Sequence, residues 1–361
     1  MHIQEFEIDS YRGIQNLTLN KLNKINILTG DNNSGKTSVL ELLSTIDNPQ
    51  NIGAWVLGAR ITNSRMRDGR LYNAFYNMFP IDEERKIIKY VFKDSNDESY
   101  CIEMRAEIDN VQISEKEMYR LEGFMRTGSN RTEEVVDAIC MHLQTYINDR
   151  IVNEYNIFDF QSLMSRFVDK HAQFYRTVYV SPVDYAKGNL YLDEVLADSE
   201  MFEQMIEILQ EFDENITNVS VIKPKGMSSA PEYMIMTKNH KKALPLSVYG
   251  DGMKKALLLL SAMLKARDGI LLLDEFETAI HTSAMDPIFS WLFNSAMKLK
   301  VQIFLTSHSK EAIEKVLKSN EELQPYISLF TLYNHEGKSL VRQMTCIEAI
   351  NALDNLGLEL R

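Results

Sequence analysis

Alternating and continuous runs of apolar residues predict the strands in the first part of the chain. Residues 3–9 and 15–20 alternate apolar with polar side chains, and residues 25–29 form a short, mostly apolar run. Both patterns are typical of strands. The segment that follows, Gly30 to Thr37, reads GDNNSGKT, and the next residues, to about residue 46, read as a helix. The pattern therefore predicts a strand, a loop bounded by glycines, and a helix.

Strands and helices alternate through the second half of the chain. Strands are predicted at 175–181, 270–273 and 301–306, and the last two read as buried strands. The other predicted elements are helices at 190–214, 252–266 and 284–299, short strands at 219–222, 232–236 and 244–248, and, from residue 327, a hairpin with a last helix. This alternation predicts a largely parallel sheet.

The middle of the chain carries a different pattern. Residues 86–94 and 99–109 alternate as strands, and residues 111–113 form a short third run. Thr132 to Glu134 resemble a helix N-cap with an acidic first turn. Apolar residues then recur every four positions, as in a helix, at Val135, Ile139, Leu143 and Ile147. We therefore interpret about 115–175 as an inserted helical subdomain.

Composition narrows the class of protein. The 361 residues are 45% hydrophobic and 25% charged, the ordinary balance of a soluble globular protein. No apolar run approaches the roughly 20 residues that cross a bilayer, and the acidic start, MHIQEFEI, is unlike a signal peptide. The three cysteines are scattered and form neither a metal spacing nor a disulfide framework. We expect a cytoplasmic protein with no membrane partner.

The net charge of −12 argues against a nucleic-acid footprint over the whole surface, but it allows a local basic groove. Four arginines cluster among aromatic residues, at Arg60, Arg65, Arg67 and Arg70. One interpretation is a surface that faces nucleic acid or phosphate. The other, which the acidic composition favours, is a helix with a solvated basic face and a buried aromatic face.

Gly30 to Thr37 has the residue types of a phosphate-binding loop, in the context that such a loop needs. Its two glycines let the backbone curl so that N–H groups point at phosphate oxygens, and the following helix start adds its dipole. Lys36 can reach the β- and γ-phosphates, and the hydroxyl of Thr37 can hold Mg²⁺. ATP and Mg²⁺ are the expected cofactors. The predicted nucleotide contacts in this stretch are Gly30, Asn32, Asn33, Ser34, Gly35, Lys36, Thr37 and Ser38.

Two further strands end in polar residues that suit phosphate chemistry. Asp274 and Glu275 follow the buried strand 270–273 at its carboxyl end, where ligands bind in such sheets. Asp274 would hold Mg²⁺ through water, and Glu275 would act as general base on the attacking water. His308 follows the strand 301–306 and could hydrogen-bond the γ-phosphate or that water. Glu275 and His308 are therefore the predicted catalytic residues.

A second anion-binding helix start is predicted at residues 246–255, LSVYGDGMKK. One chain with one nucleotide has no evident use for two such starts, so this one is expected to contact a γ-phosphate held by another subunit. The simpler interpretation is a helix with a flexible glycine start. The predicted contacts across the interface are Ser247, Gly250, Asp251 and Gly252.

These four stretches, in this order, resemble the ABC-type ATPase heads of the RecF and SMC group, most of all the small bacterial AAA ATPases related to the OLD (overcoming lysogenization defect) proteins. The resemblance covers residues 1–50 and 176–361. It implies an α/β fold of the P-loop NTPase class, with a mixed, largely parallel sheet, N-terminal antiparallel strands and the helical insertion. The expected parts are the N-terminal part of the head, the insertion and the C-terminal part, at residues 1–114, 115–175 and 176–361.

The resemblance also implies roles for single residues. Lys36 and Thr37 match the Walker A residues, Asp274 and Glu275 the Walker B pair, and His308 the switch histidine. Residues 250–255 resemble a degenerate signature motif, in which either Ser247 or Gly250 takes the place of the serine. Arg12, in the turn of the opening hairpin, lies close to bound nucleotide in many such heads.

The chain departs from the family in several places. His281 stands where many ABC heads have an aspartate that communicates across the dimer, and no glutamine loop is recognisable, although Ser181 to Asp184 follow the expected strand. We expect no room for the nuclease of full-length OLD proteins before Arg361, and residues 115–175 are too few for a coiled-coil arm.

The leading hypothesis is an ATP-hydrolysing switch. Two heads would close head-to-tail on two ATP molecules, as a homodimer or within a higher oligomer, and hydrolysis at Glu275 would reopen them. By resemblance, such heads serve beside a separate effector protein in bacterial anti-phage defence. The alternative is a RecF-like ATPase that binds DNA in repair or recombination. A third interpretation is a nucleotide-bound scaffold that barely turns over, against which the Asp274–Glu275 pair argues.

Overall fold

The computed structural model describes residues 2–56, 71–81, 86–121, 134–161, 174–187, 190–222, 232–279 and 285–356. The chain forms two compact units, and each is assembled from separate stretches of sequence. The first unit comprises Met1–Leu22, Gly30–Tyr175 and Leu332–Arg342. The second comprises Asn23–Thr29, Arg176–Thr331 and Gln343–Arg361.

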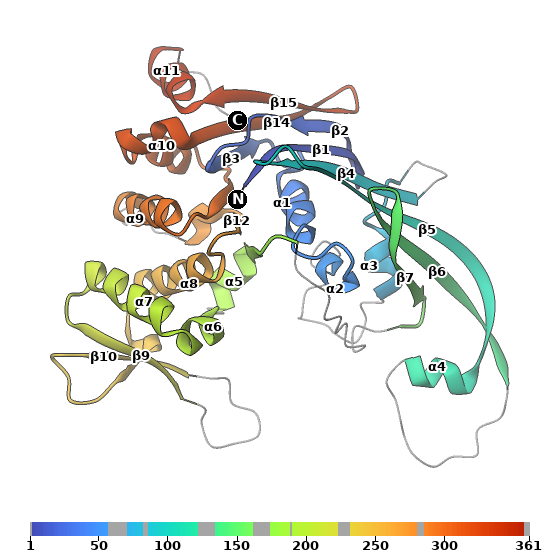
Figure 1. The fold of residues 1–361 in the computed structure, drawn as a ribbon, viewed down its shortest axis with the longest axis horizontal. Helices are drawn as coiled ribbons and strands as arrows, with labels where there is room; N and C mark the ends of the chain where they lie inside the picture. Colours follow the sequence, from blue (N-terminus) through green and yellow to red (C-terminus); the bar gives the residue numbers. More distant parts are fainter. Residues whose placement is uncertain are drawn as a thin grey trace. The chain divides into compact units, whose positions relative to one another are not determined.

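An antiparallel sheet forms the frame of the first unit, in the order β2-β1-β4-β5-β6-β7. The strands predicted at 3–9, 15–20, 86–94 and 99–109 are confirmed. β5 and β6 pair over a long stretch and curve together as one ribbon (Figure 1). The bounds are β1 Ile3–Tyr11, β2 Ile14–Leu19, β4 Lys86–Asp94, β5 Ser99–Ser114, β6 Val135–Ile147 and β7 Arg150–Phe158.

Two helices pack on this sheet through buried aromatic residues. They are α1, Lys36–Thr45, and α2, Ile52–Trp55, while α3, Leu71–Tyr76, lies against β7. The ring of Tyr90 lies 5.6 Å from that of Phe6 and 6.3 Å from that of Trp55. Its buried hydroxyl is 2.6 Å from Thr45 Oγ1 on α1. A buried phenol needs such a partner, so this contact fixes α1 over β4.

The helix predicted from residue 132 is wrong. Residues 135–147 form strand β6, and Thr132 and Glu133 lie outside the described residues. A spacing of four places residues on one face of a helix, but it also places them on one face of a strand, because four is a multiple of two. β5 supplies the long antiparallel partner that decides between the two. Residues 111–113 are likewise the end of β5, and α4, Glu115–Leu121, is the only helix described between residues 115 and 161.

The second unit is built on the sheet ordered β15-β14-β3-β13-β12-β8. The last four strands run parallel to one another, and every residue of β3, β12 and β13 is buried. Burial on both faces explains why these strands read as apolar runs and not as alternating patterns. The bounds are β3 Ile25–Gly30, β8 Thr177–Val180, β12 Ile270–Leu273, β13 Gln302–Thr306, β14 Ile327–His335 and β15 Lys338–Thr345.

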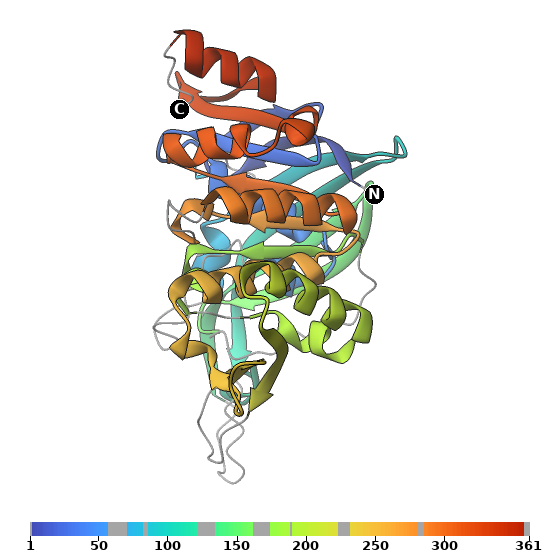
Figure 2. The same cartoon turned by 90° about the vertical axis from the view of Figure 1, so that its left-hand side faces the viewer.

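Helices of this unit pack side by side in the order α7, α8, α9, α10, α11. Figure 2 shows α9, α10 and α11 as a row running from orange to red. The predicted helices at 190–214, 252–266 and 284–299 are confirmed, whereas α10 was not predicted. The bounds are α5 Pro182–Lys187, α6 Leu192–Ala197, α7 Ser199–Phe212, α8 Asp251–Lys265, α9 Met285–Lys298, α10 Lys310–Lys318 and α11 Cys346–Leu356.

A small antiparallel sheet, β11-β10-β9, completes the second unit. β9 is Ile216–Ile222, β10 is Glu232–Thr237 and β11 is only Leu244–Pro245. The strand predicted over 244–248 is therefore wrong beyond Pro245, and residues 246–248 form a 3₁₀ turn. Proline has no N–H to continue a ladder, which is a sufficient reason for the strand to stop there. In the part of the chain that the structure describes, no helix is long and apolar enough to cross a membrane.

Candidate nucleotide site

The phosphate loop of the first unit uses backbone conformations that favour glycine. Gly30 has φ +135° and Gly35 has φ +99°, while Asn33 is in the left-handed region at φ 64°. A Cβ on Gly30 would lie 2.0 Å from the carbonyl oxygen of Leu332, and one on Gly35 would lie 2.9 Å from Ile14 Cδ1. Gly30 is therefore required by space as well as by conformation, whereas Gly35 is required by its conformation, because the end of the Ile14 side chain can shift.

Lys36 is the first residue of α1 and is almost completely buried. Its Nζ donates to the carbonyl oxygens of Gly30 and Asp31, each at 2.8 Å. Nζ also lies 3.4 Å from Ser34 Oγ. The ammonium is thus held at the concave side of the loop by the loop's own oxygens. Thr37 and Ser38 follow it in the first turn of the helix.

Arg12 is attached to the helix that follows the loop. Its Nε lies 3.4 Å from Glu41 Oε2, and the hydroxyl of Tyr11 donates to the same oxygen at 3.1 Å. Glu41 is 2% exposed, and burial together with this carboxylate raises the pKa of Tyr11 well above its ordinary value. Glu41 comes four residues after Thr37, so the two share one face of α1. Arg12 therefore lies on the side of α1 that carries a predicted Mg²⁺ ligand.

In the second unit, Asp274 follows β12 and is 4% exposed. Its Oδ1 accepts a hydrogen bond from Thr306 Oγ1 at 2.6 Å, and its Oδ2 accepts one from the hydroxyl of Tyr179 at 2.9 Å. Thr306 ends β13 and Tyr179 lies in β8, the two strands that flank β12. Neighbouring strands on both sides therefore orient this carboxylate.

Glu275 has a strained backbone, whose N–H and carbonyl groups are both hydrogen-bonded. Its φ of 46° is uncommon for a residue with a side chain. Its N–H donates to Thr306 Oγ1 at 2.8 Å, and its carbonyl accepts from the N–H and the hydroxyl of Thr278 at 2.9 and 2.8 Å. Strain of this kind persists where surrounding contacts hold it, and it is common at functional sites.

His308 lies two residues beyond the end of β13 and is half-buried. Its backbone N–H donates to Glu277 Oε1 at 2.8 Å. Glu277 belongs to the short 3₁₀ helix Phe276–Ala279, directly after Glu275. The structure therefore brings Asp274, Glu275 and His308 to one edge of the sheet, as the order of their strands predicts.

The same edge continues to β3. Leu28 pairs with Thr306, and the N–H of Ser307 donates to the carbonyl of Leu28 at 3.2 Å. The carboxyl ends of β3, β13 and β12 thus meet in this sheet, and β3 ends at Gly30, the first residue of the phosphate loop. Ligands of open parallel sheets bind at this end of the strands.

The start of α8 is open to solvent. Ser247, Gly250 and Gly252 are exposed, and a Cβ on either glycine would meet no atom within 4 Å. Asp251 is the first residue of the helix. Lys255 Nζ donates to the carbonyl of Thr278 at 3.0 Å, which ties this helix start to the segment that follows Glu275.

Several sequence-based expectations have other outcomes. His281 and the four arginines Arg60, Arg65, Arg67 and Arg70 lie outside the described residues. Where a glutamine loop was sought, the hydroxyl of Ser181 donates to Asp184 Oδ2 at 2.7 Å and its N–H donates to the same oxygen at 2.9 Å. Ser181 and Asp184 thus form a local cap at the start of α5.

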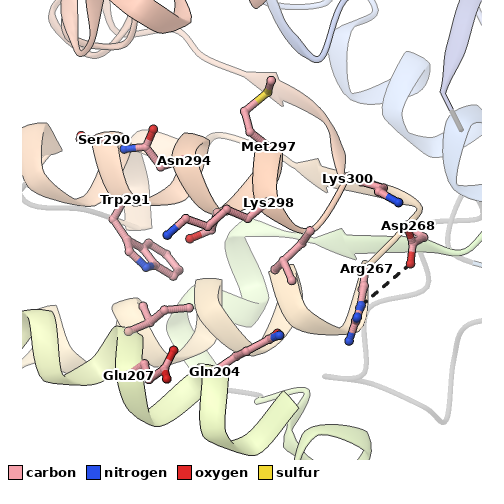
Figure 3. Close-up of a pocket in the computed structure, with 13 residues that line it drawn as sticks. Gln204, Glu207, Arg267, Asp268, Ser290, Trp291, Asn294, Met297, Lys298 and Lys300 are labelled. Atoms are coloured by element: carbon pink, nitrogen blue, oxygen red, sulfur yellow. Dashed lines mark ion pairs between the residues drawn. The ribbon is translucent and has the colours of Figure 1, made fainter. Parts of the chain in front are cut away.

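A cavity of about 920 Å³ lies elsewhere on the second unit, between α7 and α9. In Figure 3, Trp291 and Lys298 of α9 face Gln204 and Glu207 of α7, with Arg267 near one end. The turns 266–269 and 299–301 lead into the amino ends of β12 and β13. The cavity therefore opens at the edge of the sheet opposite Asp274 and is not the candidate nucleotide site.

Two family models match the chain. The family described as "AAA domain, putative AbiEii toxin, Type IV TA system" matches residues 148–314. A family of proteins of unknown function (DUF2813) matches residues 1–52. The first match includes β12, β13 and the start of α8, and the second includes the phosphate loop.

Relatives and a solved structure agree with these matches. An "ATP/GTP phosphatase" of Helicobacter pylori is 23% identical over 348 residues, which cover 86% of each chain. The SMC head domain from Thermotoga maritima superposes with a TM-score of 0.50 at 12% identity, covering 95% of this chain and 99% of that one. The chain is an ATPase, and its fold is that of the ABC-type heads of the RecF and SMC group. A shorter relative of this ATPase, the uncharacterized protein MJECL11 of Methanocaldococcus jannaschii, is 32% identical over 117 residues, 31% of this chain and 98% of that protein.

Some residues that hold the candidate site residues in place were not identified from the sequence. They are Glu41, Tyr179, Glu277 and Thr306, whose side chains contact the predicted residues or their backbone. The sequence feature that could have identified them is a polar residue within an otherwise apolar, buried element, as at Glu41 in α1 and Thr306 in β13. A buried polar group needs a partner, so each such residue marks a specific contact.

Proposed function

We propose that this ATPase is a cytoplasmic switch that closes head-to-tail on ATP and controls a separate effector protein in bacterial anti-phage defence. The observation that carries the proposal is the double hydrogen bond of Thr306, which holds Asp274 and the backbone of Glu275 at the edge where β3 ends. The chain continues from that edge into the phosphate loop with its buried Lys36.

The roles in hydrolysis follow from the chemistry of these residues. The loop N–H groups and Lys36 bind the phosphates of ATP, and Glu275 accepts the proton of the attacking water as general base. His308 donates a hydrogen bond to the γ-phosphate or orients the water. Hydrogen bonds hold the strained backbone of Glu275 in place. They support its role as general base because they fix the position from which its side chain extends.

The residues fit a magnesium ion. The proposed ligands are the hydroxyl of Thr37 and, through water, the carboxylate of Asp274, and both are hard oxygen donors of the kind that Mg²⁺ prefers. Among the described residues there is no group of three or more His, Cys, Asp or Glu side chains that could hold a metal ion. When bound, Mg²⁺ neutralises charge on the phosphates.

For the dimer, we infer that Ser247, Gly250, Asp251 and Gly252 contact the γ-phosphate held by a second copy. Support comes from the exposure of Ser247 and the two glycines and from the open space around both glycines. Gly250 and Gly252 add no side chain of their own, which lets a phosphate approach their backbone N–H groups. Either Ser247 or Gly250 takes the place of the serine in the signature motif.

The role in defence rests on resemblance. The matched family is described as a putative AbiEii toxin of a type IV TA system, which supports a role beside a second component. The alternative function is that of a RecF-like ATPase, which binds DNA in repair or recombination. Binding of duplex DNA that weakens steeply with salt and raises ATP turnover would favour it.

The test compares ATP turnover of the wild type with that of Glu275→Gln. Loss of the general base is expected to lower kcat by about 10²–10⁴-fold while ATP binding persists. In the presence of ATP and Mg²⁺, light scattering should show this variant as a dimer or a higher oligomer. Undiminished turnover would sink the base assignment, and a monomer with bound ATP would sink the head-to-tail model.

A second variant isolates the interface. Gly252→Trp places a large side chain where the chain itself leaves open space, so the monomer should fold and bind ATP. It is expected to abolish ATP-dependent association and hydrolysis. The same substitution at Glu203, exposed on α7, is the control. Association of Gly252→Trp at wild-type strength would contradict the proposed interface.

A further inference from the structure

Glu277 connects the loop after β12 with the loop after β13. It lies in the 3₁₀ helix that follows Glu275, and its Oε1 accepts the backbone N–H of His308 at 2.8 Å. The hydrogen bond therefore ties the backbone of His308 to a side chain of the loop that follows β12. The two proposed catalytic residues, Glu275 and His308, are thereby joined through one carboxylate.

The 3₁₀ helix that carries Glu277 is itself fixed on two sides. The N–H and hydroxyl of Thr278 donate to the carbonyl of Glu275, and Lys255 Nζ donates to the carbonyl of Thr278. On another side, α5 packs against the same 3₁₀ helix. A carboxylate on so constrained a segment can hold its partner in one place.

The second oxygen of Glu277 adds an independent observation. Oε2 is buried and has no hydrogen-bond partner among the described residues. A buried carboxylate oxygen without a donor costs free energy, so a carboxylate used only to fill space would be disfavoured here. The feature that explains a glutamate at this position is the hydrogen bond of its other oxygen with His308.

The neighbours of His308 show what that hydrogen bond does. Ser307 is held by its N–H to the carbonyl of Leu28, and the N–H of Ser309 donates to Ser307 Oγ. The N–H of His308 lies between these anchors and is bound by a side chain from the loop that carries Glu275. The position of the imidazole therefore depends on where Glu277 holds the backbone of His308.

We propose that Glu277 is a positioning residue for ATP hydrolysis, acting by placing His308 relative to Glu275. The inference rests on the proposed role of His308 at the γ-phosphate. Glu277 itself touches neither ATP nor the attacking water. What it must supply is an acceptor oxygen at the right distance, and its negative charge is not required.

Two conservative variants separate the acceptor from the charge. Glu277→Gln keeps an acceptor oxygen at the same reach and removes the charge, and it is expected to keep kcat within about threefold. Glu277→Asp keeps the charge but withdraws the acceptor by one methylene, and it is expected to lower kcat by about 10–100-fold. KM for ATP should change less than about threefold in both, because the phosphate loop is untouched.

A double variant tests whether Glu277 acts through His308. His308→Ala should lower kcat, and Glu277→Asp added to it should lower kcat by no more than a further twofold or so. All variants are assayed below the onset of melting, measured by circular dichroism. If the Glu277→Asp protein does not fold, the test rests on Glu277→Gln, because an amide of the same size preserves the packing.

The outcomes are distinguishable. A loss of kcat in Glu277→Gln as large as that in Glu277→Asp would overturn the proposal in favour of a direct role for the charge. Wild-type kcat in Glu277→Asp, or a further large loss in the double variant, would also overturn it. Wild-type kcat in His308→Ala would instead refute the proposed role of His308, on which the inference rests.

Discussion

Thr306 Oγ1 donates a hydrogen bond to Asp274 Oδ1 at 2.6 Å, across the neighbouring strands β13 and β12. The same oxygen accepts the N–H of Glu275 at 2.8 Å. One hydroxyl thus orients the proposed Mg²⁺ carboxylate and the backbone of the proposed base. Thr306 is 1% exposed, so water cannot replace either contact.

Replacement of Thr306 by valine is expected to impair hydrolysis without unfolding the protein. Valine keeps the shape and the β-branching of threonine but removes both hydrogen bonds. We expect kcat to fall by about 10–100-fold, the usual cost of losing a group that orients a site residue. Thr306→Ser, which keeps the hydroxyl, should retain most of the activity in the same steady-state assay. Equal activities of the two variants would contradict this role.

A methyl group on Gly30 is expected to destabilise the first unit. The Cβ of alanine would lie 2.0 Å from the carbonyl oxygen of Leu332, at a φ of +135° that alanine avoids. The expected loss in the free energy of unfolding is about 2 kcal/mol or more, measured by urea denaturation. Gly13→Ala is the control, since a Cβ there meets no atom within 4 Å. A similar stability of both variants would refute the steric argument.

Asp94 makes the stability of the first unit depend on pH. Burial raises the pKa of this carboxyl, but hydrogen bonds from the N–H groups of Asn96 and Glu98 and from the hydroxyl of Tyr175 outweigh burial and hold the pKa below its ordinary value of 3.8. A lowered pKa in the folded state gives stability that is present above the unfolded pKa and is lost as pH falls.

Thermal melting measured from about pH 7 to about pH 3 tests whether Asp94 makes the first unit less stable as pH falls. Asp94→Asn should be less stable than the wild type near neutral pH and should lose less stability on acidification. Asp97→Asn is the control, because Asp97 is exposed and pairs with Lys93 at the surface. A wild-type pH profile for Asp94→Asn would show that the carboxyl carries no such linkage.

The hydroxyl of Tyr185 is expected to contribute nothing to stability. It is buried without a hydrogen-bond partner among the described residues, and burial together with the charge of Asp274 raises its pKa well above the ordinary value, so it stays neutral. Tyr185→Phe should leave the free energy of unfolding unchanged or raise it by up to about 1–2 kcal/mol.

Tyr191→Phe is the matched control, because the hydroxyl of Tyr191 donates to the carbonyl of Tyr179 at 2.8 Å. Its removal should cost about 1 kcal/mol in the same denaturation experiment. If Tyr185→Phe were the more damaging of the two, the hydroxyl of Tyr185 would have a partner in solution.

Much of the local structure was predictable because neighbouring residues determine it. The glycines of the phosphate loop, the apolar run of β12 and the alternation of β4 each express a conformational or burial requirement of adjacent positions. β6 was not predictable in this way, because its spacing of four satisfies a helix and a strand alike, and only pairing with β5 decides.

By itself, the sequence determined a strand, a glycine-bounded loop and a helix at residues 25–46, and the buried strands that end at Asp274 and before His308. These are local properties of period, apolar content and turn residues. Only the tertiary structure decided that Thr306 joins Asp274 to Glu275, that Glu277 holds the N–H of His308, and that Arg12 reaches Glu41. Each of these contacts links residues that strand pairing and packing bring together, and no local spacing encodes them.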